Sequence, residues 1–399
     1  MKKFIFLVIL FFSILNLRAQ QISFSDSTII SLITCSPGEE VYAKFGHTAI
    51  RINDIKNGND FVFNYGIFSF ETENFYYKFI KGETDYQLGI YDTRYFLPEY
   101  AERNSIVWEQ VLNMTPAEKK NLINLLLKNY EPENRTYRYN FVFDNCATRP
   151  RDKILAALKG FVKYQPTTYS KTFRQWIGLY IGTDTWLKFG IDVIFGMDAD
   201  RTANENESMF LPEILMNEFQ TAQIESPNGQ TRKLVTDKKV LVNKRSSTEQ
   251  SDSWLLKPTF IALLLLFLGI LLTFWDVKEG KRHYKFFDTL ILVGTGLGGM
   301  IAFYLMFFSL HPLVKNNLNL LWLNPLNLFV AIMIWIRRLR MVLFFYQLLN
   351  ILFLVGALFA FALSVQDFNI AAFPLIVLLL MRSTSWFALT KSKVYRKKK

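Results

Sequence analysis

The stretch Tyr139–Ile154, YNFVFDNCATRPRDKI, contains Cys146, one of only two cysteines in the chain. The residues before Cys146 are apolar and aromatic, which favours a strand, and those after it favour a helix. The start of a helix lowers the pKa of a thiol and offers backbone N–H groups to an oxyanion. The stretch therefore predicts a strand, then a candidate nucleophile, then a helix that Asp144 or Asn145 could cap.

A cysteine nucleophile needs a base, and the base needs an orienting group. The chain has three histidines. His283 lies in the basic segment DVKEGKRHYK and His311 at the edge of an apolar span, whereas His47 begins the strand-like HTAIRI. His47 is therefore the predicted base for Cys146. Asn64, in the neighbouring strand-like FVFNYG, is the predicted orienter, and a polar residue at a strand edge is the simpler interpretation.

The second cysteine leaves an alternative open. Two cysteines in an exported chain can form a disulfide, and a bridge between Cys35 and Cys146 would block the nucleophile. Cys35 also precedes SPGEEVYAKFGH, the stretch that contains His47, so it is equally a candidate neighbour of the site.

The N-terminus MKKFIFLVILFFSILNLRAQ has two lysines, a short apolar run and a small residue at Ala19. This pattern predicts a signal peptide over residues 1–19, with an uncleaved membrane helix as the alternative. Residues 20–219 predict an exported domain of mixed α and β structure. Its clearest helix is TPAEKKNLINLLLKNY, where Thr115 and Glu118 form a capping box. Residues 220–256 are polar and predict an extended linker.

Residues 257–399 predict an all-α transmembrane bundle. From Pro258 onward there are 15 Lys and Arg against 4 Asp and Glu, so the basic excess belongs to this part. Its segments between spans alternate between basic and non-basic, which indicates membrane topology with a cytoplasmic C-terminus and not a nucleic-acid surface. Five apolar spans are predicted: Pro258–Trp275, Phe286–Phe308, Leu318–Ile336, Met341–Leu363 and Ile370–Leu389.

Within the second span, GTGLGG matches a dinucleotide-binding pattern from Gly294 to Gly299. No strand precedes it, so close helix packing through small residues is the better interpretation. Three scattered histidines and two cysteines predict no metal site and no cofactor.

Several polar residues are candidates for contact with a substrate. Asn145 and Arg149 flank Cys146. Around the third span, polar side chains are costly unless they are buried in protein or line a cavity. The polar residues of this region therefore predict a substrate or headgroup pocket, and an interfacial loop is the alternative. The candidates are His311, Asn316, Asn319, Trp322 and Asn324. The acidic DADRTANENE could bind an amine through Asp198, Asp200 or Glu207, although a solvated loop is the simpler interpretation.

PGEEVYAKFGHTAIRI, followed about a hundred residues later by FDNCATRPRD, resembles the N-terminal periplasmic domain of the Lnb-type lipoprotein N-acyltransferases. GMDADRTANENESMFLPEIL and HPLVKNNLNLLWLNP extend the resemblance over most of the chain. The resemblance implies an α+β papain-like fold, circularly permuted and similar to NlpC/P60 proteins. It also implies that Cys146 is the nucleophile and His47 its base.

The resemblance further implies a reaction. An acyl chain would move from a membrane phospholipid to Cys146, and then to the α-amino group of a diacylglyceryl-cysteine lipoprotein. The expected location is the bacterial inner membrane, with the N-terminal domain in the periplasm. Two alternatives are a cysteine hydrolase acting on murein peptides or lipid acyl esters, and a non-catalytic, disulfide-locked envelope protein. A thiol tethered to five spans suits a substrate that is itself in the bilayer.

Overall fold

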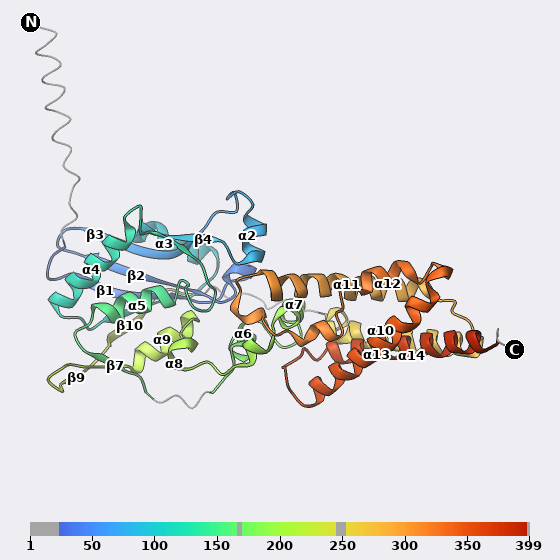
Figure 1. Cartoon of the computed structure of the whole chain (residues 1–399). Helices are drawn as coiled ribbons and strands as arrows, with labels where there is room; N and C mark the ends of the chain where they lie inside the picture. Colours follow the sequence, from blue (N-terminus) through green and yellow to red (C-terminus); the bar gives the residue numbers. More distant parts are fainter. Residues whose placement is uncertain (1–23, 166–169, 245–252, 397–399) are drawn as a thin grey trace, which may run out of the picture.

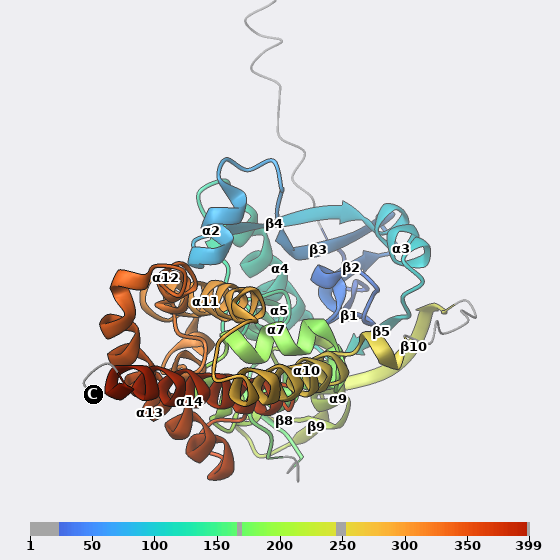
Figure 2. The ribbon, with the colours of Figure 1, turned by 90° about the vertical axis from the view of Figure 1, so that its right-hand side faces the viewer.

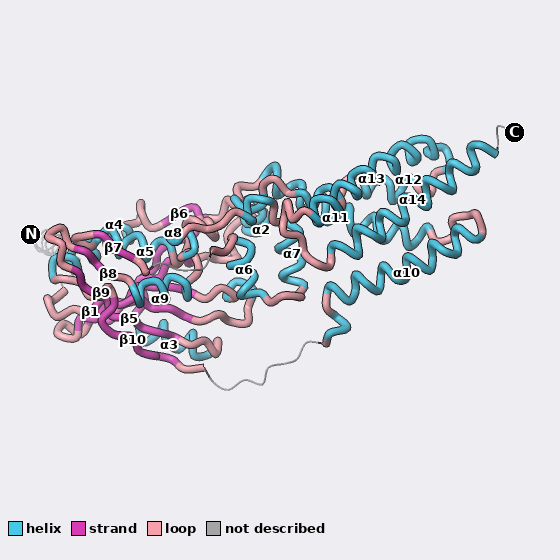
Figure 3. Tube along the Cα trace, turned by 90° about the horizontal axis from the view of Figure 1, so that it is seen from below, coloured by secondary structure: helices cyan, strands magenta, loops and turns pink. Residues whose placement is uncertain are grey.

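The computed structural model describes residues 24–165, 170–244 and 253–396, with a sheet-containing domain at one end and a helical bundle at the other (Figure 1). The predicted signal peptide lies outside the described residues. Seen from below, the strands gather in the N-terminal domain and long helices make up the rest (Figure 3).

The N-terminal domain is built on an antiparallel sheet of seven strands in the order β10-β5-β1-β2-β3-β4-β6. The predicted strands HTAIRI and FVFNYG are confirmed as β2 and β3, which pair antiparallel. The strands are β1 (Ile29–Cys35), β2 (His47–Asp54), β3 (Asn59–Ile67), β4 (Asp85–Asp92), β5 (Val107–Leu112), β6 (Thr136–Arg138) and β10 (Val235–Val242).

Both faces of this sheet are covered, which explains the nearly continuous apolar run IISLITC of β1. Ile30 and Leu32 point to one face and Ile33 and Cys35 to the other, because successive strand residues alternate. The first face packs against α4 (Pro116–Tyr130), α5 (Thr148–Ala157) and α9 (Pro212–Thr221), and the second against α3 (Thr93–Glu102). The capping box predicted at Thr115 is present at the start of α4.

The region predicted as a linker, residues 220–256, is folded over much of its length. β8 (Gln223–Glu225) and β9 (Thr231–Lys233) form a small sheet with β7 (Phe161–Lys163), and β10 then adds an edge strand to the main sheet. β10 was not predicted because VTDKKVLV is polar on its outer side, and an edge strand tolerates charged residues.

Four long apolar helices form the bundle: α10 (Pro258–Lys278), α11 (Lys285–Phe308), α13 (Arg340–Ala362) and α14 (Ala372–Arg396). Among the described residues, these are the helices long and apolar enough to cross a membrane. They correspond to four of the five predicted spans.

The prediction of one continuous helix for Leu318–Ile336 is wrong. The segment forms a 3₁₀ turn, Leu318–Leu321, then an irregular stretch containing Pro325, then the short helix α12 (Asn327–Met333). Proline has no backbone N–H and restricts the residue before it, so it separates the two pieces. Hydropathy alone does not reveal this interruption.

The broken segment nevertheless runs along α11 toward its far end. Lys285, the first residue of α11, donates from Nζ to the carbonyl of Ile334 at 3.1 Å. The glycines of GTGLGG permit the close approach, because a Cβ at Gly299 would lie 2.2 Å from the carbonyl oxygen of Leu323. The expected small-residue packing is therefore present, and its partner is the interrupted segment.

Candidate active site

Cys146 lies immediately before α5, and a tight turn leads into it. Asn140 and Asp144 exchange two backbone hydrogen bonds of 3.0 Å, and the Asn140 side chain accepts from the N–H groups of Val142 and Phe143. The predicted strand before Cys146 is therefore wrong. A side-chain oxygen that bonds the backbone two and three residues ahead favours a turn over a strand.

Asn145 holds this turn against the start of α5. Its Oδ1 accepts from the N–H groups of Ala147 and Thr148 at 2.8 and 2.9 Å, and its Nδ2 donates to the carbonyls of Phe141 and Phe210. Only 2% of Asn145 is exposed. Its amide is fully occupied, so its placement fits the positioning of Cys146 and not contact with a substrate.

His47 is the first residue of β2, and its ring is held from two sides. Nε2 of His47 lies 2.5 Å from Oδ1 of Asn64 on β3. The Tyr100 ring from α3 stacks on the imidazole with 6.1 Å between centroids and 16° between planes. The Asn64 oxygen can accept only from a protonated Nε2, which leaves Nδ1 as the basic nitrogen of the neutral ring.

His47 and Cys146 meet across Gly66. A Cβ added at Gly66 would lie 3.5 Å from Cβ of Cys146 and 4.0 Å from Cε1 of His47. Gly66 has a φ of +90°, which a residue with a side chain rarely adopts, and it lies in a β-bulge between β3 and β4. The backbone N–H of Thr48, next to His47, is close enough to the Cys146 thiol to lower its pKa. The topology thus brings a thiol, an imidazole and an amide together.

Burial keeps both reactive groups neutral at rest. It raises the pKa of Cys146 to about 11, against the lowering effect of the Thr48 and Cys146 N–H groups. It lowers the pKa of His47 to about 4, although the bond to Asn64 raises it. The thiol pKa lowered by a helix terminus, as expected from the sequence, is therefore not found, because desolvation outweighs the nearby N–H groups.

Cys35 lies behind the site. Cys35 and Cys146 are both free thiols, and Cys35 is buried. Cys35 faces His47 across the β1–β2 pair. Burial raises the pKa of Cys35 well above its usual range, against the lowering effect of the nearby Tyr100 hydroxyl. Cys35 therefore supports the back of the imidazole together with Tyr100.

Three tyrosines around Cys146 were not singled out in the sequence. Tyr86, Tyr137 and Tyr139 come from β4, β6 and the residue after it. The pKa of each is raised, first by burial and then by the charge that Cys146 would carry as a thiolate. No local signal in the sequence distinguishes these rings from core residues.

Arg149 is engaged within the domain. It forms a bidentate pair with Asp144 at 2.5 and 2.8 Å, and its guanidinium lies 3.5 Å from the centroid of the Tyr137 ring. This arrangement braces the turn before Cys146.

The polar residues predicted to form a pocket in the membrane segment instead hold the two parts of the molecule together. Asn316 donates to Asp198, and Asn319 donates to the backbone carbonyls of Asp192 and Val193. His311 bonds the carbonyl of Phe79 through Nε2. These contacts dock the loops of the bundle onto the N-terminal domain.

Trp322 and Asn324 form their hydrogen bonds within their own segment of the bundle. Trp322 is 1% exposed and donates to the Asn319 side chain, while Asn324 accepts from the N–H of Leu326. A cavity of about 430 Å³ does lie at the joint, and none of the five predicted residues lines it; its walls comprise Thr172, Gln175, Asp200, Phe361, Ser364, Gln366, Asp367 and Phe368.

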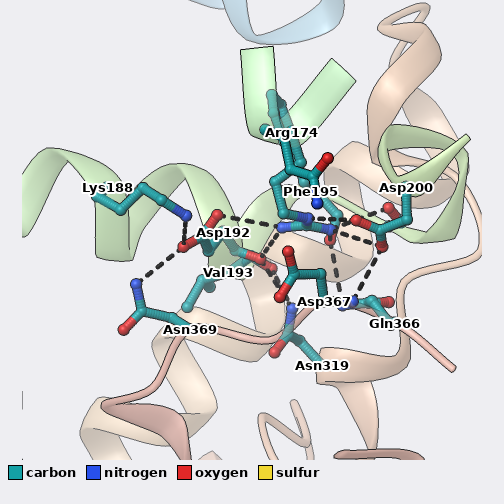
Figure 4. A network of polar contacts seen from close by, with 12 residues as sticks. Arg174, Lys188, Asp192, Val193, Phe195, Asp200, Asn319, Gln366, Asp367 and Asn369 are labelled. Atoms are coloured by element: carbon teal, nitrogen blue, oxygen red, sulfur yellow. Dashed lines mark hydrogen bonds and ion pairs between the residues drawn. The ribbon is translucent and has the colours of Figure 1, made fainter. Parts of the chain in front are cut away.

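A buried ionic network lies at the centre of the joint (Figure 4). Arg174 of α6 (Phe173–Ile181) pairs with Asp192 of α7 (Trp186–Ile194) and with Asp200, and both Arg174 and Asp192 are almost fully buried. Asp192 also bonds Lys188 and Asn369, the latter from the loop before α14. The three acidic residues predicted as candidates to bind an amine all have partners within the chain. Asp198 accepts from Asn316, Asp200 pairs with Arg174, and Glu207 pairs with Arg201.

Replacing Asn64 with alanine should slow acylation of Cys146 by roughly ten- to a hundredfold without unfolding the domain. The Asn64 amide holds the imidazole of His47 in one plane and one tautomer, and Tyr100 retains part of that restraint in its absence. Single-turnover acylation by a soluble ester would measure the change. Asn64→Asp should retain more activity than Asn64→Ala. Equal rates for the wild type and both variants would show that Asn64 does not orient His47.

The fold and the site define a membrane protein whose N-terminal α/β domain places a cysteine and a histidine on either side of Gly66. Residues 17–176 match the Lnb N-terminal periplasmic domain, and residues 249–394 match the Lnb transmembrane domain. Together, the two matches support an Lnb-family membrane protein with a periplasmic N-terminal domain. No curated protein and no solved structure matched the chain.

Proposed function

We propose that this protein is a lipoprotein N-acyltransferase that works through a thioester on Cys146. The observation that carries the proposal is the meeting of Cys146 and His47 across Gly66, with His47 held by Asn64. The domain with this site is docked on a bundle of membrane-length helices, which suits substrates that are themselves held in a membrane.

In the first step, His47 takes the proton of the Cys146 thiol as the sulfur attacks an acyl ester carbonyl of a phospholipid. The carbon–sulfur bond forms, the ester carbon–oxygen bond breaks, and the imidazolium returns the proton to the lysophospholipid oxygen. The N–H groups of Thr48 and Cys146, both of which lower the pKa of the Cys146 thiol, are the proposed donors to the oxyanion.

In the second step, the free α-amino group of a diacylglyceryl-cysteine lipoprotein attacks the thioester. Neutral His47 accepts a proton from the amine, an amide bond forms, and the proton passes to the departing sulfur, which restores the thiol. The surrounding tyrosine rings would exclude water, and this exclusion would favour attack by the amine over hydrolysis of the thioester.

We also infer a papain-like arrangement for the domain, because Cys146 precedes a helix that packs on the antiparallel sheet carrying His47 and Asn64. The C-terminus is proposed to be cytoplasmic. Basic residues gather between the bundle helices at the end remote from the domain, in KEGKRHYK and in Arg337, Arg338 and Arg340.

The test is the intact mass of a reporter lipoprotein from a bacterial host that lacks any other N-acyltransferase. Wild-type protein should add the mass of one fatty acyl chain to the N-terminal cysteine, and Cys146→Ser should add none. Cys35→Ala is the matched control and should still acylate, because its thiol lies behind the imidazole. Absence of the added mass with folded wild-type protein would exclude the transferase and favour the hydrolase alternative.

A further inference from the structure

The short helix α2 (Phe75–Lys81) presents large apolar side chains to the outside of the molecule. Of its seven residues only Phe75 is buried, whereas Tyr76, Tyr77, Phe79 and Ile80 are 71%, 56%, 48% and 46% exposed. Tyr42 and Phe70 lie beside it, and both are more than half exposed. Here these six exposed residues are named the α2 surface: Tyr42, Phe70, Tyr76, Tyr77, Phe79 and Ile80.

Contiguous exposed aromatic residues are uncommon on a domain surrounded by water, and they mark a surface that contacts a partner or a membrane. The C-terminal turn of α2 adds two cations, Lys78 and Lys81, beside the aromatic rings. Aromatic side chains interleaved with lysines are typical of helices that lie in a membrane interface.

The α2 surface is fixed to the end of a membrane-length helix. The N–H of Leu310, just after α11, donates to the carbonyl of Lys81 at 2.8 Å, and the His311 ring bonds the carbonyl of Phe79 at 2.8 Å. In both views α2 lies beside the domain-facing part of α11 (Figures 1 and 2).

Large exposed apolar side chains lie on both sides of this junction, on α11 as on α2. The last turns of α11 and the residue beyond Ser309 expose Phe303, Phe307, Phe308 and Leu310. These side chains belong to a helix long and apolar enough to span a bilayer, so its end lies at the membrane interface. The α2 surface therefore lies at the same depth.

A series of ring contacts connects this surface with Cys146. Phe68 follows Gly66 by two residues, and its ring lies 5.0 Å from Phe70 and 5.6 Å from Phe75. On its other side Phe68 stacks on Tyr86 at 4.8 Å. Tyr86 in turn stacks on Tyr139 at 4.1 Å. Both tyrosines lie close enough to Cys146 for a thiolate charge there to raise their pKa. A continuous series of aromatic contacts thus connects the α2 surface with the surroundings of the nucleophile.

We propose that the α2 surface inserts into the membrane interface and directs the acyl chain of a bilayer phospholipid toward Cys146. The occupant is a phospholipid because the surface adjoins a membrane-length helix and carries Lys78, a cation that suits a phosphate, whereas Lys81 is paired with Glu83. Membrane contact stands on the geometry alone, whereas delivery of the acyl chain rests on the proposed acyltransferase function.

Membrane contact can be tested without any turnover. In a Cys146→Ser background, Tyr76→Cys would be labelled with an environment-sensitive fluorophore and the full chain reconstituted in phosphatidylethanolamine and phosphatidylglycerol vesicles. Lipids with a nitroxide quencher near the headgroup should quench this label strongly. The matched control is Tyr95→Cys on α3, 69% exposed and on an element away from the bundle, where quenching should be weak. Equal quenching at both positions, or contact of residue 76 with a second protein copy, would overturn the proposal.

Delivery is tested with the double variant Tyr76→Ser, Phe79→Ser. Loading of Cys146 from the same vesicles, followed by intact mass, should be roughly tenfold slower than in wild type. Loading by p-nitrophenyl butyrate, a soluble ester, should be unchanged. Equal loading from vesicles would refute delivery. If wild-type Cys146 is loaded by neither donor, the proposed acyltransferase function and the delivery proposal both fail, while the quenching result still decides membrane contact.

Discussion

Replacing His47 with alanine should lower the rate of thioester formation on Cys146 by about a thousandfold at pH 7. Burial raises the pKa of the thiol to about 11, so only about one molecule in ten thousand carries a thiolate at this pH. Attack therefore depends on a base that removes the proton during the reaction. Single-turnover acylation with a soluble ester would measure the loss.

The pH dependence separates a missing base from a damaged fold. Between pH 6 and 9 the wild-type rate should be flat, because His47 is neutral above about pH 4 and the thiol stays protonated below about pH 11. Without the imidazole, the rate should rise about tenfold per pH unit with the thiolate fraction. His283→Ala is the matched control and should behave as wild type. A wild-type rate that also rises tenfold per unit would contradict the role of His47.

Replacing Arg174 with leucine should lower the free energy of unfolding by about 3–5 kcal/mol. Arg174 is 2% exposed, and its guanidinium donates to the carboxylates of Asp192 and Asp200 and to backbone carbonyls of the segment between them. Leucine removes these donors, so the Asp192 carboxylate keeps only Lys188 and Asn369 as partners at the joint of domain and bundle (Figure 4). Thermal unfolding of the full chain in detergent would report the loss as a lower Tm.

Arg201→Leu is the matched control for this prediction. Arg201 pairs with Glu207, but its side chain is 52% exposed, so its loss should cost less than about 1 kcal/mol. Arg174→Lys should rescue only partly, because an ammonium cannot donate in two parallel bonds as a guanidinium does. Equal Tm values for Arg174→Leu and Arg201→Leu would show that the buried network does not hold the joint.

Local signals in the sequence were sufficient for several elements. The capping box at Thr115 begins α4 because both of its bonds lie within four residues. β2 and β3 follow from short runs of β-branched and aromatic residues, and four long apolar stretches form helices because their backbone bonds are internal. The turn before Cys146 was missed, because the aromatic residues of FVF outweighed the hydrogen-bonding side chain of Asn140.

The candidate site divides in the same way. The sequence alone determined that Cys146 and His47 were the residues to bring together, since few cysteines and histidines are available in the exported part. Only the tertiary structure decided that the two residues meet across Gly66, that burial keeps both neutral, and that Asn316 and Asn319 brace a joint. Those features depend on contacts between residues far apart in the chain, and on the loss of water around them, neither of which a local pattern encodes.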